Sequence, residues 1–292
     1  MPANTLLQDV IDTHSPLVSA DQLEELLSEP TLKVFDVRGT WSTSPASASP
    51  HEYDAGHIPG AVFLDWTKHF VEQDVALGLA AVAEKNGAEQ AFGELGINEG
   101  DLVVLYDDYH HMLAGRIWWA MRHWGFANVR VLNGGWRYWS ARNKPVSQDS
   151  PEIAPGTFQP QQKEGLLISL EQLISTKDQH CVIDARGAQS YAGKAEDPRT
   201  GHIPGSLNLP FAAVLDPETG LFLDPGSIAG VFDKATPQWR EKPVITTCGS
   251  GYAATITLLA LSELEQTAGM FDGSFAIWKQ DPDRPVSQAI TE

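Results

Sequence analysis

The sequence contains few cysteines, and the two that it has, Cys181 and Cys248, do not form a Cys-x-x-Cys pair. We therefore expect no zinc site, no dithiol redox centre, no other metal and no cofactor. The sequence also lacks an apolar run long enough to cross a bilayer, and its N-terminal segment lacks the basic stretch of a secretory signal. These absences predict a cytoplasmic protein that contacts no membrane and keeps its thiols reduced.

Basic residues are scarce as well. Lysine and arginine number 20 against 38 aspartate and glutamate residues, and the formal net charge is −18. Such a chain offers no basic patch to nucleic acid or an anionic membrane, so we expect neither as a partner. Apolar residues make up 42% of the 292 residues, which is enough for hydrophobic cores, and the length favours two domains.

The most informative segment is VITTCGSGYAATITLLAL, residues 244–261. Its β-branched start predicts a buried strand, and the apolar residues 253–264 have helical spacing. Cys248 lies between them in a glycine-rich loop, where successive amides and a helix N-terminus favour the thiolate. The thiolate is the nucleophilic form, so Cys248 is the candidate catalytic residue. The alternative is a buried structural cysteine, which is our interpretation of Cys181 in the apolar run CVID.

The chain repeats itself over a long period, which indicates a tandem duplication. The matching segments occur in the same order in both halves: SADQLEELL (19–27) and SLEQLI (169–174), VFDVR (34–38) and VIDAR (182–186), GHIPGA (56–61) and GHIPGS (201–206), VLNGGWRYW (131–139) and MFDGSFAIW (270–278), and Pro-Val-Ser at 145–147 and 285–287.

Short apolar strands alternate with amphipathic helices in each half, which predicts an α/β fold with mostly parallel sheets covered on both faces. We expect a non-catalytic domain at residues 1–147, a linker rich in Pro, Gln and Ser at 148–166, and a catalytic domain at 167–292. Ligands of such sheets bind beyond the carboxyl ends of the strands. Aligning VVLYD with VITTC places Asp107 opposite Cys248, so the first half lacks the nucleophile.

The tandem halves with their GHIPG turns and a single Cys-Gly-Ser-Gly loop resemble the two-domain rhodanese-type sulfurtransferases. The resemblance implies two rhodanese-like domains and transfer of a sulfane sulfur through a persulfide on Cys248. Members that use 3-mercaptopyruvate have Cys-Gly-Ser-Gly, as here, whereas members that use thiosulfate typically have Arg and Lys after the cysteine. The resemblance therefore favours 3-mercaptopyruvate as donor, with thiosulfate as the alternative, and a thiol such as thioredoxin, or cyanide, as acceptor.

The resemblance also implies roles for individual residues. Ser250 matches a serine that assists proton transfer to the departing enolate, so it joins Cys248 as a catalytic candidate. Arg199 matches an arginine that binds the substrate carboxylate, and a planar guanidinium suits that group. The loop amides are expected to hold the sulfur and the substrate; the loop residues assigned to substrate binding are Gly249, Gly251, Tyr252 and Ala253.

The sequence departs from the family pattern at Ser190, where a second substrate arginine is usual. Arg186, Lys194 or Arg116 could replace it, although Arg186 is also expected to pair with an acid, as in this motif throughout the fold. His57 matches the histidine of a proposed serine–histidine–aspartate relay, but no acid stands where the relay aspartate is expected. Bracing the turn is the alternative role of His57, and His202 is expected to be structural.

Trp41 matches an aromatic residue near the donor pocket of related enzymes. The neighbouring His110 and His111 are expected in a solvated loop. A cysteine phosphatase needs Cys-x5-Arg to clamp phosphate, but Ala254 occupies the arginine position. A non-catalytic sulfur-binding module is the third functional class, and the intact Cys248 loop argues against it.

Overall fold

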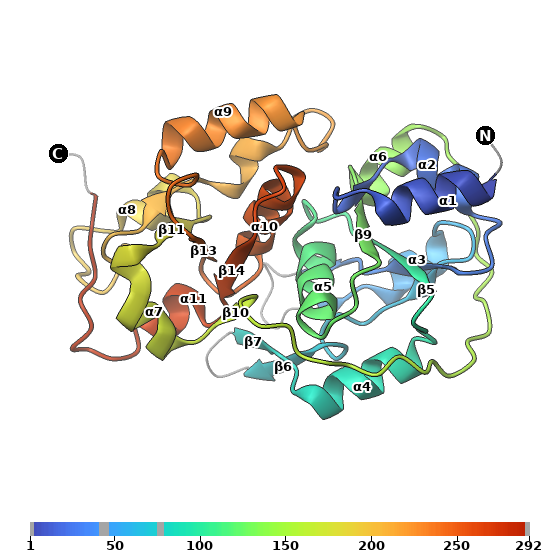
Figure 1. Ribbon diagram of the computed structural model, residues 1–292, viewed down its shortest axis with the longest axis horizontal. Coiled ribbons are helices and arrows are strands. Elements are labelled where there is room, and N and C mark those ends of the chain that lie inside the picture. The colour runs from blue at the N-terminus through green and yellow to red at the C-terminus, as the bar shows by residue number, and fades with distance from the viewer. Residues whose placement is uncertain (1–2, 41–46, 75–78, 290–292) are drawn as a thin grey trace. The chain divides into compact units, whose positions relative to one another are not determined.

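A computed structural model describes residues 3–40, 47–74 and 79–289 of the chain (Figure 1). Trp41 lies outside these described residues. The chain divides into two compact units, one formed mainly by residues up to Lys163 and the other mainly by residues from Glu164 on. Residues 217–221 group with the first unit. The domain boundaries expected from the sequence stay a prediction.

The first half contains fifteen of the named elements among its described residues. They are α1 (Ala3–Asp12), β1 (Leu17–Val18), α2 (Ala20–Leu26), β2 (Leu32–Asp36), β3 (Gly39–Thr40), β4 (Ser47–Ala48), α3 (Pro50–Ala55), β5 (Val62–Phe63), β6 (Val71–Asp74), β7 (Leu79–Val82), α4 (Lys85–Glu94), β8 (Leu102–Tyr106), α5 (Met112–His123), β9 (Val129–Leu132) and α6 (Gly135–Ala141).

The second half repeats much of this order. Its elements are β10 (Leu167–Ile168), α7 (Leu170–Thr176), the 3-10 helix η1 (Lys177–Gln179), β11 (Cys181–Asp184), α8 (Ala188–Ala192), β12 (Leu207–Asn208), η2 (Phe211–Val214), α9 (Pro225–Ala235), β13 (Val244–Thr247), α10 (Ala253–Glu263), β14 (Ala268–Phe271) and α11 (Ser274–Trp278).

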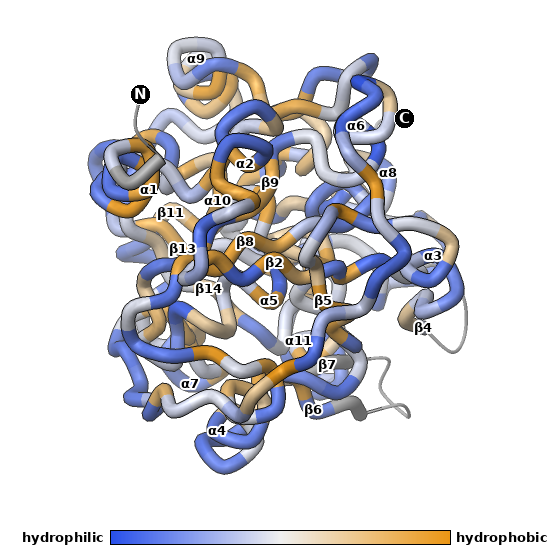
Figure 2. The backbone as a smooth tube through the Cα atoms, turned by 90° about the vertical axis from the view of Figure 1, so that its right-hand side faces the viewer, coloured by the Kyte–Doolittle hydropathy of each residue, from blue (hydrophilic) through white to orange (hydrophobic). Residues whose placement is uncertain are grey.

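The two main sheets have equivalent topology, which confirms the predicted α/β fold. The first has the strand order β1-β9-β8-β2-β5 and the second β10-β14-β13-β11-β12. All strand pairs in both sheets are parallel. The central strands β8 and β13 are buried along their whole length, and Figure 2 shows the central strands as hydrophobic segments. Strands covered on both faces need such continuous apolar runs.

The repeated Ser-x-x-Gln sequences begin corresponding helices. Ser19 accepts a hydrogen bond from the Gln22 amide, and the Gln22 side chain accepts one from the Ser19 amide. Ser169 and Gln172 form the same capping box at α7. Each box satisfies two amide donors that a helix N-terminus otherwise leaves unpaired. The duplication therefore preserves a helix start as well as the strands.

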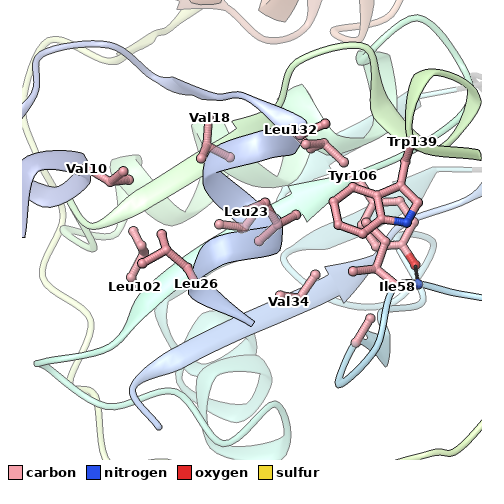
Figure 3. Close-up of a cluster of buried hydrophobic side chains, with 13 residues drawn as sticks. Val10, Val18, Leu23, Leu26, Val34, Ile58, Leu102, Tyr106, Leu132 and Trp139 are labelled. Carbon is pink, nitrogen blue, oxygen red and sulfur yellow. Dashed lines mark hydrogen bonds between the residues drawn. The ribbon is translucent and has the colours of Figure 1, made fainter. Parts of the chain in front are cut away.

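The first core fills the space between the sheet and the helices α1, α2 and α6 (Figure 3). Leu23 and Leu26 of α2 pack there with Val34 of β2 and with Tyr106 of β8. A second cluster in the other unit includes Leu173, Ile245 and Phe271. Burying a side chain of this size contributes about 1.5–3 kcal/mol, so these clusters stabilise the sheets on which the loops depend.

The repeated GHIPG and Pro-Val-Ser segments pair with each other. His57 and Ser147 exchange backbone hydrogen bonds of 2.9 Å in both directions. In the second half, the His202 amide donates to Ser287 at 2.8 Å and the Ser287 amide donates back at 3.0 Å. Segments about ninety residues apart are thus joined by the same backbone pairing in each half.

The predicted linker has no helix or strand, but it is held against the first unit. The Gly156 amide donates to the Gly93 carbonyl at 2.8 Å, and the Gln161 amide donates to the Trp124 carbonyl at 3.0 Å. The buried Phe158 ring packs against those of Phe92 and Phe126, which also contact each other. This extended segment is therefore packed on the first unit through fixed contacts, unlike a flexible linker.

Candidate functional site

The candidate site lies where β13 ends and α10 begins, as the sequence predicts. β13 occupies the middle of its sheet between β14 and β11. Its β-branched residues are fully buried, and Cys248 follows at the carboxyl end of the strand. Residues 249–252 form the connecting loop, and α10 starts at Ala253. A buried strand and a buried helix thus fix both ends of the loop.

The sulfur of Cys248 has two polar neighbours. The Gly251 amide donates to it at 3.2 Å, with Gly251 at a φ of 88° that favours glycine. The Ser274 hydroxyl oxygen lies 3.8 Å from the sulfur. Cys248 is 2% exposed, so little water competes for these contacts. A backbone N–H that points at the sulfur is suited to a thiolate or a persulfide anion.

Ser274 is the functional candidate that reading the sequence missed. Its hydroxyl accepts a hydrogen bond from the Cys248 amide at 3.2 Å and donates to the Phe271 carbonyl at 3.2 Å. Ser274 is fully buried, with a φ of 50° that is unusual for a residue with a Cβ. Gly135 occupies the matching place in the first half. That serine-for-glycine difference between the repeats was the available signal.

The other loop candidates differ in exposure. Ser250 and Gly249 are half-buried, whereas Tyr252 is buried. The Tyr252 carbonyl accepts hydrogen bonds from the amide and the hydroxyl of Thr255 in the first turn of α10. Ala253 is half-buried at the helix start. The structure therefore brings all four residues together around Cys248, while their roles in binding or proton transfer stay predictions.

Arg186 forms the ion pair that the motif leads us to expect. Its guanidinium contacts the buried carboxylate of Asp184 at 2.5 Å and donates to the Gly201 carbonyl at 2.8 Å. It also lies over the Phe275 ring, 4.4 Å from the centroid. Arg38 and Asp36 form the equivalent pair in the first half at 2.6 Å. Since the first half lacks the cysteine, the pair serves the fold in both halves.

Arg199 has its terminal nitrogens directed at backbone carbonyls. One nitrogen donates to Lys279 at 2.6 Å and to Asp281 at 2.8 Å. The other donates to Arg284 at 2.8 Å and to Pro282 at 3.4 Å. The guanidinium thus holds the segment after α11 in place. Binding of a substrate carboxylate by Arg199 stays a prediction, and these contacts compete with it.

His57 is fully buried, and its two ring nitrogens face backbone carbonyls. They lie 2.8 Å from the Tyr53 oxygen and 3.1 Å from the Asp149 oxygen, and the ring stacks on Tyr53 with centroids 3.9 Å apart. His202 stacks on Tyr191 at 3.7 Å in the same way. Of the two alternatives for His57, this geometry favours bracing of the turn, and its relay role stays a prediction.

The first half contains an anion-holding loop that is filled by its own side chain. One carboxylate oxygen of Asp107 accepts hydrogen bonds of 2.9 Å from the amides of Tyr109 and His111, and the other accepts bonds of 2.8 Å from those of Leu113 and Ala114.

The expectation that His111 lies in a solvated loop is wrong: it is 3% exposed, and its Nε2 accepts a hydrogen bond from the Gly134 amide at 2.9 Å.

A cavity of about 550 Å³ adjoins the Cys248 loop on the side of Gly249. Three basic side chains, those of Arg186, Lys194 and Lys279, line it together with the polar side chains of Gln189, Ser190 and Thr200. No acidic residue is among the residues that line this cavity. Ser190, where the family pattern is broken, is thus brought next to the loop, whereas Arg199 is not among the lining residues.

The described residues contain no group of three or more His, Cys, Asp or Glu residues placed to hold a metal ion. None of their helices has both the length and the apolar character that crossing a membrane requires.

Two parallel sheets of equal topology, with a cysteine-bearing loop at the carboxyl edge of one, define a tandem α/β protein of the predicted kind. The model of the rhodanese-like domain matches the chain twice, over residues 19–142 and 167–281. The chain therefore belongs to the rhodanese family, which confirms the resemblance drawn from its motifs.

Similar proteins extend over nearly the whole chain. The 3-mercaptopyruvate sulfurtransferase of Rattus norvegicus is 33% identical over 291 residues, which cover 93% of this chain and 95% of the relative. Thiosulfate/3-mercaptopyruvate sulfurtransferase 1, mitochondrial, of Arabidopsis thaliana is 30% identical over 311 residues. The aligned region covers 94% of this chain and 79% of the relative. The crystal structure of SseA from Escherichia coli has a TM-score of 0.78 and 28% identity, covering 89% of this chain and 98% of that chain.

Proposed function

We propose that this chain is a sulfurtransferase that moves a sulfane sulfur from 3-mercaptopyruvate to an acceptor through a persulfide on Cys248. The observation that carries the proposal is the position of the Cys248 sulfur, which lies at the end of β13 and accepts a hydrogen bond from the Gly251 amide. The names of the similar proteins from Rattus norvegicus and Arabidopsis thaliana support the reaction class.

The first step breaks the carbon–sulfur bond of the donor. The Cys248 thiolate attacks the donor sulfur, a sulfur–sulfur bond forms, and the electron pair of the broken bond stays on carbon as the enolate of pyruvate. A proton, delivered with the help of Ser250, completes pyruvate. The Gly251 amide is placed to stabilise the negative sulfur, and the Ser274 hydroxyl can turn its single proton from the Phe271 carbonyl toward a thiolate.

The second step returns the enzyme to its starting state. An acceptor thiolate attacks the outer sulfur, the sulfur–sulfur bond of the persulfide breaks, and Cys248 leaves as the thiolate. A small thiol, thioredoxin or cyanide fits this step, and we propose these as acceptors in a cytoplasmic setting. The first half contributes no nucleophile, because Asp107 stands where the second half has Cys248.

Thiosulfate is the second candidate donor. The thiosulfate/3-mercaptopyruvate sulfurtransferase of Arabidopsis thaliana supports it by name. The loop itself favours 3-mercaptopyruvate, because Gly249 and Ser250 bring no cation to the position next to the sulfur.

The decisive experiment compares kcat/KM for the two donors with the same acceptor. We expect 3-mercaptopyruvate to be preferred, and a clear preference for thiosulfate would overturn the donor assignment. Cys248→Ser should abolish transfer from both donors. Cys181→Ser is the matched control, because Cys181 is buried in β11, where desolvation raises the pKa of its thiol, and it should retain activity.

A further inference from the structure

The cavity beside the Cys248 loop has a charge opposite to that of the chain. The chain carries 38 acidic and 20 basic residues. The cavity is nevertheless lined by Arg186, Lys194 and Lys279 and by no acidic residue. A local positive field attracts anions to that point even when the protein as a whole is strongly acidic.

The two lysines supply the net charge of this cavity. The charge of Arg186 is balanced by the ion pair with Asp184, and its Nη2 also donates to the Gly201 carbonyl. Neither Lys194 nor Lys279 forms an ion pair with a carboxylate among the residues that the structure describes. Two ammonium groups on flexible stems are thus available to a ligand that enters the cavity.

The cavity is connected to the reactive loop through chain neighbours. Gly249, which lines the cavity, directly follows Cys248, and Phe275, which also lines it, directly follows Ser274. The Phe275 amide donates to the Cys248 carbonyl at 3.0 Å, and the Ala276 amide donates to the Gly249 carbonyl at 3.1 Å. A ligand held in the cavity therefore lies against the loop that carries the sulfur.

Position 190 is a serine, so it brings no positive charge to the cavity. The family resemblance places a substrate arginine there, and the structure puts Ser190 in the wall of this same cavity. Lys194 follows α8 and Lys279 follows α11, so the positive charge comes from two other segments. Arg116, another replacement considered from the sequence, is fully buried within α5 of the first unit.

We propose that Lys194 and Lys279 bind the carboxylate of a small-molecule substrate of the sulfur-transfer reaction, in place of the arginine missing at Ser190. This inference rests on the proposed function. The cavity volume of about 550 Å³ is ample for a three-carbon acid and is in the usual range for small-molecule sites. The carboxylate could thus belong to the donor or to an acceptor thiol that carries one.

Direct binding tests the site without turnover. Calorimetry with pyruvate and with 3-mercaptopropionate should show weaker binding in Lys194→Gln and Lys279→Gln, by about fivefold each, as expected for one partly exposed ion pair. The double variant should lose about 25-fold if the effects add in free energy. The control Lys177→Gln/Lys234→Gln removes the same charge from residues outside the cavity lining and should bind as the wild type does.

Kinetics then identifies the source of the carboxylate. If it belongs to the donor, the double variant raises KM for 3-mercaptopyruvate with the neutral acceptor 2-mercaptoethanol. If it belongs to the acceptor, the variant instead loses the preference for 3-mercaptopropionate over 2-mercaptoethanol.

Unchanged binding of both carboxylates in the double variant overturns the inference, even if the wild type transfers sulfur. Lysine-dependent binding in a protein that transfers no sulfur from 3-mercaptopyruvate would instead overturn the proposed function and leave the anion site standing. The two failures are therefore distinguishable.

Discussion

The hydroxyl oxygen of Ser274 lies 3.8 Å from the Cys248 sulfur and 3.2 Å from the Cys248 amide nitrogen. Ser274 adopts a φ of 50° to reach this position, although the matching residue of the first half is Gly135. A backbone of this kind costs about 1–3 kcal/mol for a residue other than glycine. Because this strained serine lies beside the Cys248 sulfur, its hydroxyl is a candidate for a role in the proposed sulfur transfer.

Ser274→Gly is expected to lower kcat for sulfur transfer by about tenfold, which corresponds to one hydrogen bond to a charged group. KM for the donor should change little, because the hydroxyl faces the sulfur rather than the cavity. The glycine variant relieves the strained φ but leaves the buried Cys248 amide without its acceptor, so these opposing effects should leave the free energy of unfolding nearly unchanged. Steady-state kinetics and urea unfolding measure the two effects. A wild-type kcat in this variant would contradict the role of the hydroxyl.

Asp107→Asn should destabilise the first unit. The Asp107 carboxylate accepts four backbone hydrogen bonds. In the asparagine variant, an NH2 group replaces one carboxylate oxygen and faces backbone N–H groups, with which it cannot form hydrogen bonds. Leaving buried donors unpaired costs about 1–3 kcal/mol in the free energy of unfolding. Denaturant unfolding checks this value against Asp54→Asn, a change at an exposed residue of α3. Equal stability of the two variants would show that the loop does not need its internal anion.

Hydrophobic periodicity and the repeated segments predicted the strands, the helices and the two halves, because these signals lie in residues that are neighbours in the sequence. The strand β13 and the helix α10 were expected within one residue of their observed ends, and the five repeated segments identified the two equivalent halves. The place of Cys248 at a strand end followed from those patterns alone.

The rest depended on contacts between distant segments. Ser274 reaches Cys248 across 26 residues, and its backbone conformation is set by the turn from β14 to α11. The burial of His111 likewise depends on the Gly134 amide, 23 residues away. No pattern of neighbouring residues carries such information, because tertiary packing decides it.

Tyr106→Phe should change the response of the fold to alkaline pH. The Tyr106 hydroxyl is buried and donates to the Asp36 carboxylate at 2.7 Å. Burial first, and the charge of Asp36 second, raise the pKa of Tyr106 well above its usual 10.0. The stability from the neutral phenol is thus fully present below about pH 10 and is lost as the pH rises further, because only the unfolded chain releases the proton.

The phenylalanine variant lacks that proton. It should be less stable than the wild type at pH 8 by about 1 kcal/mol, the value of one hydrogen bond, and this difference should shrink above pH 10. Urea unfolding of both proteins from pH 8 to 10.5 measures the difference. A gap that stays constant over this range would show that Tyr106 ionises equally in the folded and unfolded chains.

Arg199→Ala separates a direct role in substrate binding from a structural one. Because the guanidinium donates to four carbonyls between Lys279 and Arg284, its loss should lower the free energy of unfolding by about 1–3 kcal/mol. The donor KM should rise at the same time, since the Lys279 backbone is one of the groups that Arg199 holds. Arg240→Ala is the control, because Arg240 forms an exposed pair with Asp233 and should affect neither quantity strongly. A raised donor KM with unchanged stability would instead favour direct binding of the carboxylate by Arg199.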